Sequence, residues 1–153
     1  MKLKRSTIAG LVLGVAFGLA AGAVAFTFIY AKGASYLTND PKACANCHIM
    51  QEQLDGWVKS SHRNVATCND CHTPHNFVGK YWTKGRNGFW HSYYFTMGNY
   101  PDPIQITDRS RKITERACRD CHADIVATIE GHDDDERNQT SCLRCHRNVG
   151  HLH

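Results

Sequence analysis

The strongest feature of the hydrophobic pattern is a single apolar run near the N-terminus. Residues 6–31 carry no charged side chain, and the 23 residues from Ile8 to Tyr30 are almost uniformly apolar. As an α-helix this run extends roughly 34 Å at 1.5 Å per residue, which is enough to cross a bilayer. We therefore expect a transmembrane helix over about residues 8–30, inside a membrane anchor that comprises residues 1–32.

The charges beside this run predict its orientation. Lys2, Lys4 and Arg5 precede it, and the positive-inside rule then keeps the N-terminus in the cytoplasm. Residues 33–153 are expected on the periplasmic side of a cytoplasmic (inner) membrane, as a separate domain. A cleaved signal peptide is the alternative, but the run is longer than the usual apolar region of such a peptide.

Glycines recur every four residues within the apolar run, at Gly10, Gly14, Gly18 and Gly22. This spacing places them along one stripe of a helix and permits close approach by a second transmembrane helix, including that of another copy. Ordinary glycine enrichment in membrane helices explains the same pattern without self-association.

The rest of the chain shows few strand signals and several short helical segments. We expect helices at Asp55 to Ser61, Thr107 to Ala117 and Asp124 to Glu130, and a loop from Gly98 to Pro103, where glycine, asparagine and proline cluster. The pattern predicts a mainly α fold in which one transmembrane helix precedes a small domain of short helices and loops.

The cysteines indicate what holds that domain together. All eight lie in four Cys-x-x-Cys pairs, each followed directly by histidine: Cys44/Cys47/His48, Cys68/Cys71/His72, Cys118/Cys121/His122 and Cys142/Cys145/His146. This is the attachment motif of haem c. Disulfides or zinc sites are the alternative, but neither requires a histidine after every pair. We expect four covalent haems, which would supply much of the core of about 120 residues.

The axial ligands are only partly determined by these motifs. Four haems have eight axial positions, and the motif histidines fill at most four of them. Six other histidines remain: His62, His75, His91, His132, His151 and His153. The residues alone do not pair them with haems. Met50 lies two positions after His48, and its thioether is either an iron ligand or a packing group.

The formal net charge of +4 does not indicate nucleic acid. Four haems bring about eight propionate charges, and no basic run occurs outside the N-terminus. Residues 77–100 hold nine of the fifteen aromatic side chains, and no Asp or Glu occurs between Cys71 and Pro101. Such a segment suits the lipid headgroup region, although the aromatics can instead pack on haem faces.

The chain resembles a known family in the following stretches: Ser35-Tyr36-Leu37, Asp40-Pro41-Lys42-Ala43, the first motif with Met50, Ser61-His62, and Cys68 to His75. It is similar to the NapC/NirT/NrfH family of membrane-anchored tetrahaem quinol dehydrogenases over nearly its whole length. The short tail after the fourth motif looks most like the NrfH branch, the small membrane subunits of cytochrome c nitrite reductases.

The resemblance implies a ligand set. Haem 1 would take Met50 rather than His48, and its other face would have no strong protein ligand. His72 and His151 would ligate haem 2, and His146 and His62 would ligate haem 4. Haem 3 would take His122 from this chain, and its second ligand can be a lysine of the partner subunit. His75 and His153 have no assigned role, and His132 is a competing candidate for the second ligand of haem 3.

The resemblance also implies that menaquinol is oxidised beside haem 1. Lys84 fits the lysine of the family's quinol pocket, with Lys80 as a second candidate. Asn87 and His91 stand where the family has an acidic residue. His91 can accept a proton there, because the ordinary pKa of histidine is about 6.5.

The implied partner is the pentahaem catalytic subunit of the ammonia-forming cytochrome c nitrite reductase, on which nitrite would be reduced. This chain would then be the quinol-oxidising electron-transfer subunit. A feeder of nitrate or S/N-oxide reductases is the nearest alternative. A membrane-tethered electron store or redox sensor, and a haem enzyme acting on nitric oxide or hydroxylamine, are the alternatives from other classes.

Overall fold

The computed structural model describes residues 4–130 and 140–151. The chain forms two compact units, Met1–Ser35 and Tyr36–His153. The first holds helix α1 (Arg5–Tyr30), and none of its residues is buried. Within the described residues α1 is the one helix that is long and apolar enough to cross a membrane. His132 and His153 lie outside the described residues.

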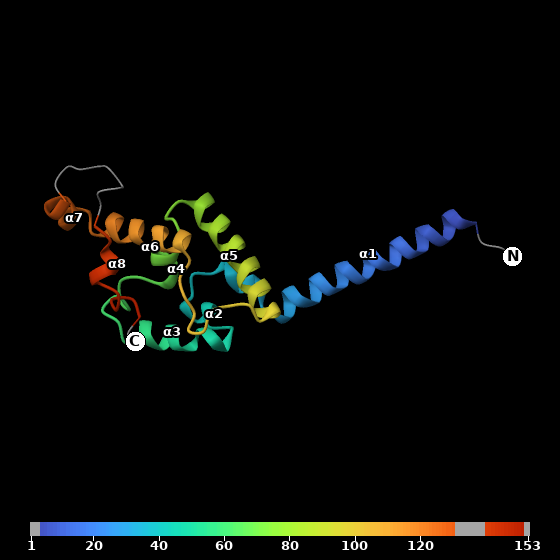
Figure 1. Cartoon of the computed structure of the whole chain (residues 1–153), viewed down its shortest axis with the longest axis horizontal. Coiled ribbons are helices and arrows are strands. Elements are labelled where there is room, and N and C mark those ends of the chain that lie inside the picture. Colours follow the sequence, from blue (N-terminus) through green and yellow to red (C-terminus); the bar gives the residue numbers. More distant parts are fainter. Residues whose placement is uncertain (1–3, 131–139, 152–153) are drawn as a thin grey trace. The chain divides into compact units, whose positions relative to one another are not determined.

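The second unit consists of short helices joined by loops, and the described residues contain no strand (Figure 1). This confirms the expected mainly α fold. After a 3-10 turn at Gly33–Leu37, the elements are α2 (Pro41–Cys44), a 3-10 turn at His48–Met50, α3 (Gln51–Val58), α4 (Cys68–His72), α5 (Phe77–Met97), α6 (Asp108–Cys121), α7 (Ala123–Glu130) and α8 (Cys142–Cys145).

Helix α5 is the longest of the helices that the hydrophobic pattern did not predict; the short helices α2, α4 and α8 are the others. Helix α5 has 21 residues and begins where the Asn76 side chain accepts a hydrogen bond of 2.7 Å from the amide of Gly79. Its last residue is Met97. The next residue, Gly98, has a φ of 65° and therefore the left-handed conformation that glycine adopts without strain. The expected loop begins at Gly98.

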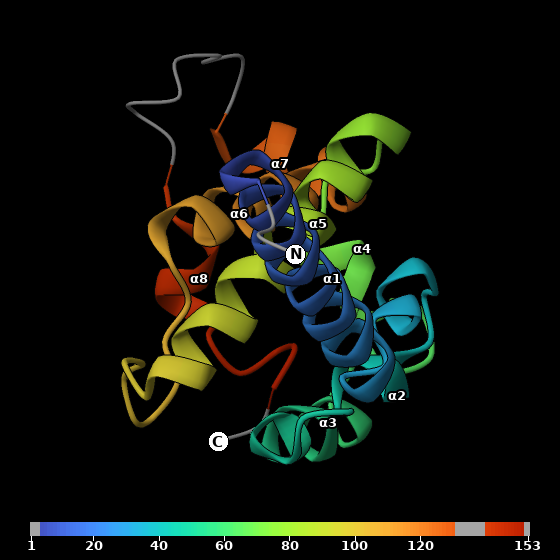
Figure 2. The same cartoon turned by 90° about the vertical axis from the view of Figure 1, so that its right-hand side faces the viewer.

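The three expected helices, observed as α3, α6 and α7, lie close to their expected positions. Helix α3 begins four residues before the expected Asp55, and α6 continues past Ala117 to Cys121. Helix α4 packs against α6, which also contacts α7 and α8 (Figure 1). The last described residues run beside α3, where the Nδ1 atom of His151 lies 2.9 Å from the carbonyl oxygen of Gln53 (Figure 2).

Apolar side chains contribute little to the interior of this unit. Among the described residues the one buried apolar residue is Ala117, at 6% exposure. The buried polar residues are Ser60, Asn69, Thr73, Thr83, Lys84 and Thr114. Since burial of apolar area is the main force that stabilises a small domain, these helices need a further apolar component to hold them together.

Candidate haem-binding site

Short helices carry three of the four cysteine pairs. The second and fourth pairs open α4 and α8, and the third pair ends α6. Cysteines three residues apart on a helix point to the same side. The amide of His122 donates to Cys118 and that of His146 donates to Cys142, both at 2.9 Å, so the third and fourth motifs share one backbone arrangement.

The first motif has a different backbone. Cys44 ends α2, whereas Cys47 lies outside it and precedes the 3-10 turn at His48–Met50. The amide of Met50 donates a hydrogen bond of 2.9 Å to the carbonyl of Cys47. His48 packs edge-on against Phe95 of α5, with the ring centres 6.4 Å apart. The histidine and the methionine of this motif are thus presented from a tight turn and not from the end of a helix.

None of the described cysteines is in a disulfide, and the motifs adjoin one another in chain order. The thiol of Cys44 is hydrogen-bonded to Cys68 of the second motif. Cys71 and Cys121 are close enough for their charges to interact, as are Cys118 and Cys142. Burial, then the charge of Cys142, raises the pKa of the Cys118 thiol to about 11. Each motif therefore adjoins the next, from the first to the fourth.

Two pairs of histidine rings lie next to one another, one pair tilted by 32° and the other edge-on at 76°. The ring centres of His72 and His151 are 6.0 Å apart, and those of His62 and His122 are 6.1 Å apart. Burial, followed by the charges of His151 and His91, lowers the pKa of His72 to about 4, which keeps that imidazole neutral. Neutral imidazole is the form that binds a metal. His62 also contacts the carbonyl oxygen of Val149 at 3.2 Å.

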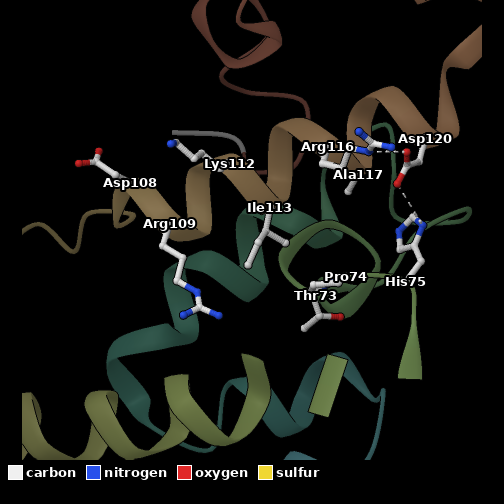
Figure 3. Close-up of a pocket in the computed structure, with 10 residues that line it drawn as sticks. All are labelled: Thr73, Pro74, His75, Asp108, Arg109, Lys112, Ile113, Arg116, Ala117 and Asp120. Atoms are coloured by element: carbon white, nitrogen blue, oxygen red, sulfur yellow. Dashed lines mark hydrogen bonds and ion pairs between the residues drawn. The ribbon is translucent and has the colours of Figure 1, made fainter. Parts of the chain in front are cut away.

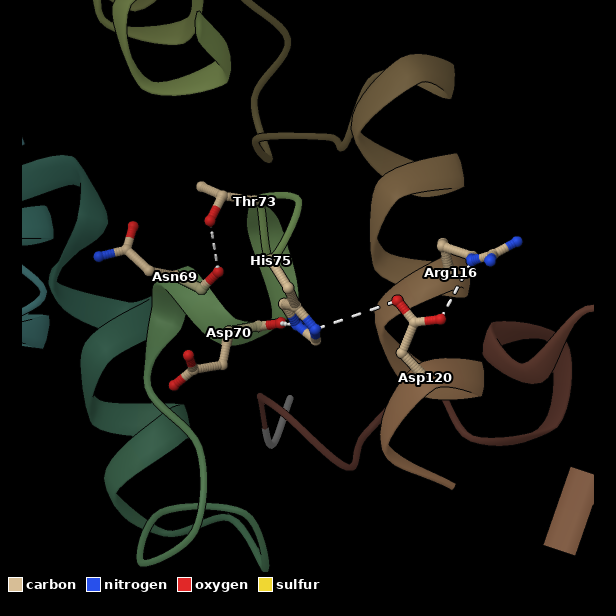
Figure 4. Close-up of polar contacts among 6 residues, drawn as sticks. All are labelled: Asn69, Asp70, Thr73, His75, Arg116 and Asp120. Carbon is tan, nitrogen blue, oxygen red and sulfur yellow. Dashed lines mark hydrogen bonds and ion pairs between the residues drawn. The ribbon is translucent and has the colours of Figure 1, made fainter. Parts of the chain in front are cut away.

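His75 joins the second motif to the third (Figure 4). Its Nε2 atom lies 2.9 Å from the carbonyl oxygen of Asp70, and its Nδ1 atom lies 4.0 Å from the carboxylate of Asp120. Arg116 donates a hydrogen bond of 3.0 Å to the other oxygen of Asp120. Both ring nitrogens of His75 thus face oxygen atoms of the protein, and the ring holds α4 against α6.

A cavity of about 500 Å³ lies between the residues that follow α4 and the face of α6 (Figure 3). Pro74, Ile113 and Ala117 supply apolar atoms to its lining, and its charged residues are three basic ones and two acidic ones: Arg109, Lys112, Arg116, Asp108 and Asp120. A flat apolar group that carries carboxylates, such as haem, matches this combination of surfaces.

The residues present therefore fit haem c. Four Cys-x-x-Cys-His motifs without disulfides adjoin one another, two further histidines lie next to motif histidines, and almost no apolar side chain is buried in the described residues. The zinc alternative fits less well, because the described residues contain no group of three or more His, Cys, Asp or Glu arranged to hold a metal ion.

One face of helix α5 lies against the first motif and the residues before it. This face is formed by Lys84, Gly88, His91 and Phe95. Gly88 lies against the ring of Tyr36, where an added Cβ would approach the ring to 3.2 Å. Phe95 contacts His48, and the charge of His91 acts on His72. We call this the inner face of α5. The sequence patterns did not identify Tyr36 as a site residue, although it lies within the Ser35-Tyr36-Leu37 stretch on which the resemblance partly rests.

Lys84 is the most buried of the three candidate quinol-pocket residues. It is 8% exposed, and its Nζ atom donates a hydrogen bond of 2.6 Å to the carbonyl of Thr38. Burial, then the charge of Lys80, lowers its pKa, and Cys44 acts in the opposite direction. Asn87 is half-buried, and His91 is exposed. Desolvation by nearby atoms also lowers the pKa of His91. These residues occupy consecutive turns of α5.

A carboxylate on α6 holds the start of the fourth motif. Glu115 accepts hydrogen bonds from the hydroxyl of Ser141, from the amide of Cys142 at 2.8 Å and from the amide of Leu143 at 3.2 Å. Burial alone would raise the pKa of Glu115, but these donors outweigh it and lower the pKa. The sequence gives no local sign of this contact, because Glu115 precedes Ser141 by 26 residues.

The four-motif arrangement matches a known protein family over nearly the whole chain. The model of the NapC/NirT cytochrome c family, N-terminal region, matches residues 3–153. The chain belongs to the NapC/NirT cytochrome c family. This confirms the resemblance seen in the motifs, and covalently bound haem c follows from membership of this cytochrome c family.

Similar proteins within the family come from several bacteria. The cytochrome c-type protein NrfH of Wolinella succinogenes is 36% identical over 146 residues, which are 90% of this chain and 82% of that protein. The cytochrome c nitrite reductase subunit NrfH of Nitratidesulfovibrio vulgaris is 34% identical over 93% of this chain and 83% of its own length. The cytochrome c-type protein NapC of Escherichia coli is 26% identical over 74% of this chain and 68% of its own length.

A solved structure matches nearly the whole chain. It is the crystal structure of the cytochrome c nitrite reductase NrfHA complex bound to the HQNO inhibitor, with a TM-score of 0.61 and 30% identity over 97% of this chain and 91% of that one. The NapC/NirT membership, this match and the apolar helix α1 together indicate a single-pass membrane protein.

Proposed function

We propose that this NapC/NirT cytochrome is a membrane-anchored tetrahaem quinol dehydrogenase that oxidises menaquinol and supplies electrons to the catalytic subunit of a cytochrome c nitrite reductase. The observation that carries the proposal is the likeness, over almost the entire chain, to a protein of the NrfHA complex. Both NrfH relatives support the same assignment. Nitrite reduction belongs to the partner subunit in this proposal.

The eight cysteines would hold four haems through thioether bonds. When bound, haem c provides a one-electron carrier whose potential depends on its axial ligands. His72 and His151 are proposed as a pair across haem 2, because a ring separation of 6.0 Å leaves room for a metal–nitrogen bond of about 2 Å on each side. His146 is proposed for haem 4.

The ring geometry favours a different role for His62 from the one that the resemblance implies. The ring of His62 lies edge-on to that of His122 with the centres 6.1 Å apart, which is nearly the separation of the first pair. We therefore assign His62 to haem 3, opposite His122, in preference to haem 4. A lysine from the partner subunit then becomes unnecessary at haem 3, and the second ligand of haem 4 would come from elsewhere.

Met50 is proposed as the ligand of haem 1. The distinct backbone of the first motif supports this assignment, since the turn at His48–Met50 joins the amide of Met50 to the carbonyl of Cys47 and His48 packs against Phe95. A thioether is a weaker donor than imidazole and favours ferrous iron, so this haem would accept electrons readily.

The quinol site is proposed on the inner face of α5. Lys84 has three N–H donors and uses one for Thr38, so it can also donate to a quinol oxygen. His91 lies about two turns further along the same face and is proposed to accept a quinol proton. Asn87 is proposed to orient the quinol ring between them through its amide.

The proposed topology follows the charges around α1. Lys2, Lys4 and Arg5 precede the helix, so the N-terminus would remain in the cytoplasm and the haem domain, residues 33–153, would lie in the periplasm. Protons from menaquinol would then be released outside the cytoplasm. The glycine stripe of α1 would allow association with another copy.

The direct test is menaquinol-dependent reduction of the haems in proteoliposomes that contain the full-length holoprotein. We expect reduction without any partner, and we expect nitrite-dependent reoxidation only after the nitrite reductase catalytic subunit is added. Reoxidation by a nitrate reductase alone would support the alternative that the likeness to NapC suggests. A failure of menaquinol to reduce any haem would exclude both functions.

A further inference from the structure

Helix α5 has a second face that the proposed quinol site does not use. Its inner face contacts Tyr36, Thr38 and His48. Residues on the opposite side follow one another at intervals of four, four, three and four, as neighbours on one helix face do. They are Val78, Trp82, Arg86, Phe89 and Tyr93, and we call them the outer face of α5.

The outer face is apolar, aromatic and exposed. Val78 is 76% exposed, Trp82 66% and Phe89 62%. Phe89 and Tyr93 stack on one another with their ring centres 6.4 Å apart, so they form a continuous aromatic surface. Each contact that joins α5 to the first motif lies on the other side of the helix, so these side chains point away from the first haem motif.

The charge on this surface has one sign. No Asp or Glu occurs between Cys71 and Pro101, whereas Lys80 and Arg86 add positive charge and Arg86 is exposed on the outer face. Aromatic side chains combined with basic ones are the composition of helices that lie in the headgroup region of a bilayer. Acidic phospholipid attracts such a surface electrostatically.

The covalent connection to α1 favours the bilayer as the occupant. Helix α1 ends at Tyr30, and the second unit begins at Tyr36. A connection of so few residues keeps the second unit near the surface of the membrane that α1 spans, which raises the effective concentration of that surface around α5. A soluble partner has no such advantage.

We propose that the outer face of α5 binds the headgroup region of the membrane that α1 spans, with acidic phospholipid around Arg86. This contact is separate from the transmembrane anchor and does not depend on quinol oxidation. One consequence rests on the proposed function: Lys84 and His91, on the inner face of the same helix, would lie one helix diameter, roughly 10 Å, from the headgroups that the outer face contacts, so menaquinol would have to pass α5 to reach them.

The test uses the full-length holoprotein in vesicles of phosphatidylcholine, with and without phosphatidylglycerol. A phospholipid with a photoreactive diazirine near its headgroup is included, and labelled residues are mapped by mass spectrometry after illumination. We expect labels on Trp82, Phe89 and Tyr93, increased by phosphatidylglycerol. Helix α7 is the matched control, because Ile125 and Ile129 are also exposed, at 59% and 74%, on a helix that contains acidic residues.

Three variants complete the experiment. Combined Phe89→Ser and Tyr93→Ser substitutions should abolish labelling of Trp82, and combined Ile125→Ser and Ile129→Ser substitutions should leave it unchanged. Arg86→Gln, which leaves the apolar surface intact, should remove the effect of phosphatidylglycerol. Haem content and menaquinol-dependent haem reduction are measured on the same vesicles, so a failure of the proposed function is distinguished from a failure of this one.

Labels confined to α1, or equal labelling of α5 and α7, would overturn the proposal. Equal labelling of α5 in neutral and acidic vesicles would overturn the role of acidic lipid. Crosslinks that join the outer faces of two chains, with no lipid label on either, would show that a second copy covers this surface in place of the bilayer.

Discussion

The ammonium group of Lys84 donates a hydrogen bond of 2.6 Å to the main-chain carbonyl of Thr38. The side-chain amide of Asn69 donates a hydrogen bond of 3.2 Å to the same carbonyl, so one oxygen receives donors from both α4 and α5. This contact fixes the segment before the first motif against the two helices behind it. Lys84 is therefore a structural residue as well as the proposed quinol donor.

Substitution of Lys84 by methionine removes both interactions, and two separate measurements report on the two roles. Lys84→Met keeps the buried stem but removes the ammonium, so the hydrogen bond to a quinol oxygen is lost. We expect the rate of menaquinol-driven haem reduction to fall at least about tenfold, which corresponds to about 1.4 kcal/mol of transition-state stabilisation. The free energy of unfolding should fall by about 1–3 kcal/mol, because the Thr38 carbonyl loses a charged donor.

Lys80→Met is the matched control, since Lys80 lies one turn earlier on α5 and is only half-buried. It should change neither the rate nor the stability by much. Full quinol oxidation by Lys84→Met, with a normal complement of haems, would remove Lys84 from the quinol site and leave only its contact with Thr38.

Glu115 should make the stability of the fourth motif depend on pH. Its three donors lower its pKa in the folded protein, so its contribution to stability is present above the unfolded pKa, near 4.3, and is lost as the pH falls through the folded pKa. Glu115→Gln cannot carry the negative charge. We expect a loss of about 1–2 kcal/mol at neutral pH, and a smaller difference from the wild type in acid.

Thermal unfolding of the holoprotein across this pH range measures the effect. Glu52→Gln is the control, because Glu52 is an exposed residue in the first turn of α3. A difference between wild type and Glu115→Gln that stays constant down to the acid limit would show that the carboxylate charge contributes nothing and that only the shape of the side chain matters.

These two contacts illustrate what the sequence could and could not predict. The haem motifs, the apolar helix and the loop after Gly98 depend on local patterns, and each was predicted from them. The contact of Glu115 with Ser141, like that of Lys84 with Thr38, joins residues 26 and 46 positions apart. No local pattern indicates such pairs, because they depend on how the helices pack.

Helix α5 was missed for a different reason. It contains Gly79, Gly85 and Gly88, which lower helix propensity. Aromatic side chains occur on both of its faces, so it lacks the single apolar stripe that identifies a helix packed against a protein core. Both faces are explained if one meets the first haem motif and the other meets a membrane surface.

The position of His62 predicts which haem loses a ligand when it is removed. Since its ring lies edge-on to that of His122 with the centres 6.1 Å apart, His62→Ala should convert haem 3 from low spin to high spin in the isolated chain. His62→Ala and His122→Met should each change the electron paramagnetic resonance signal of haem 3. The double variant should change the signal of haem 3 and leave the signals of the other haems as they are.

The resemblance to the family predicts the opposite result. If His62 belongs to haem 4, its removal and that of His146 will affect one component, and haem 3 will change its spectrum only when the partner subunit binds. A haem 3 spectrum that is identical in the isolated chain and in the complex would support a ligand from this chain.

The last prediction concerns the ligand of haem 1, for which His48 and Met50 compete. In the turn at His48–Met50, His48 packs against Phe95 with the ring centres 6.4 Å apart, whereas the third and fourth motifs share the arrangement in which histidine follows a helix end. A methionine ligand with no strong ligand opposite leaves part of the iron high-spin. We therefore expect one high-spin haem among four. Met50→Leu should alter that signal alone, and His48→Ala should leave it largely unchanged. A spectrum in which His48→Ala abolishes the high-spin signal while Met50→Leu has no effect would identify His48 as the ligand and Met50 as a packing residue.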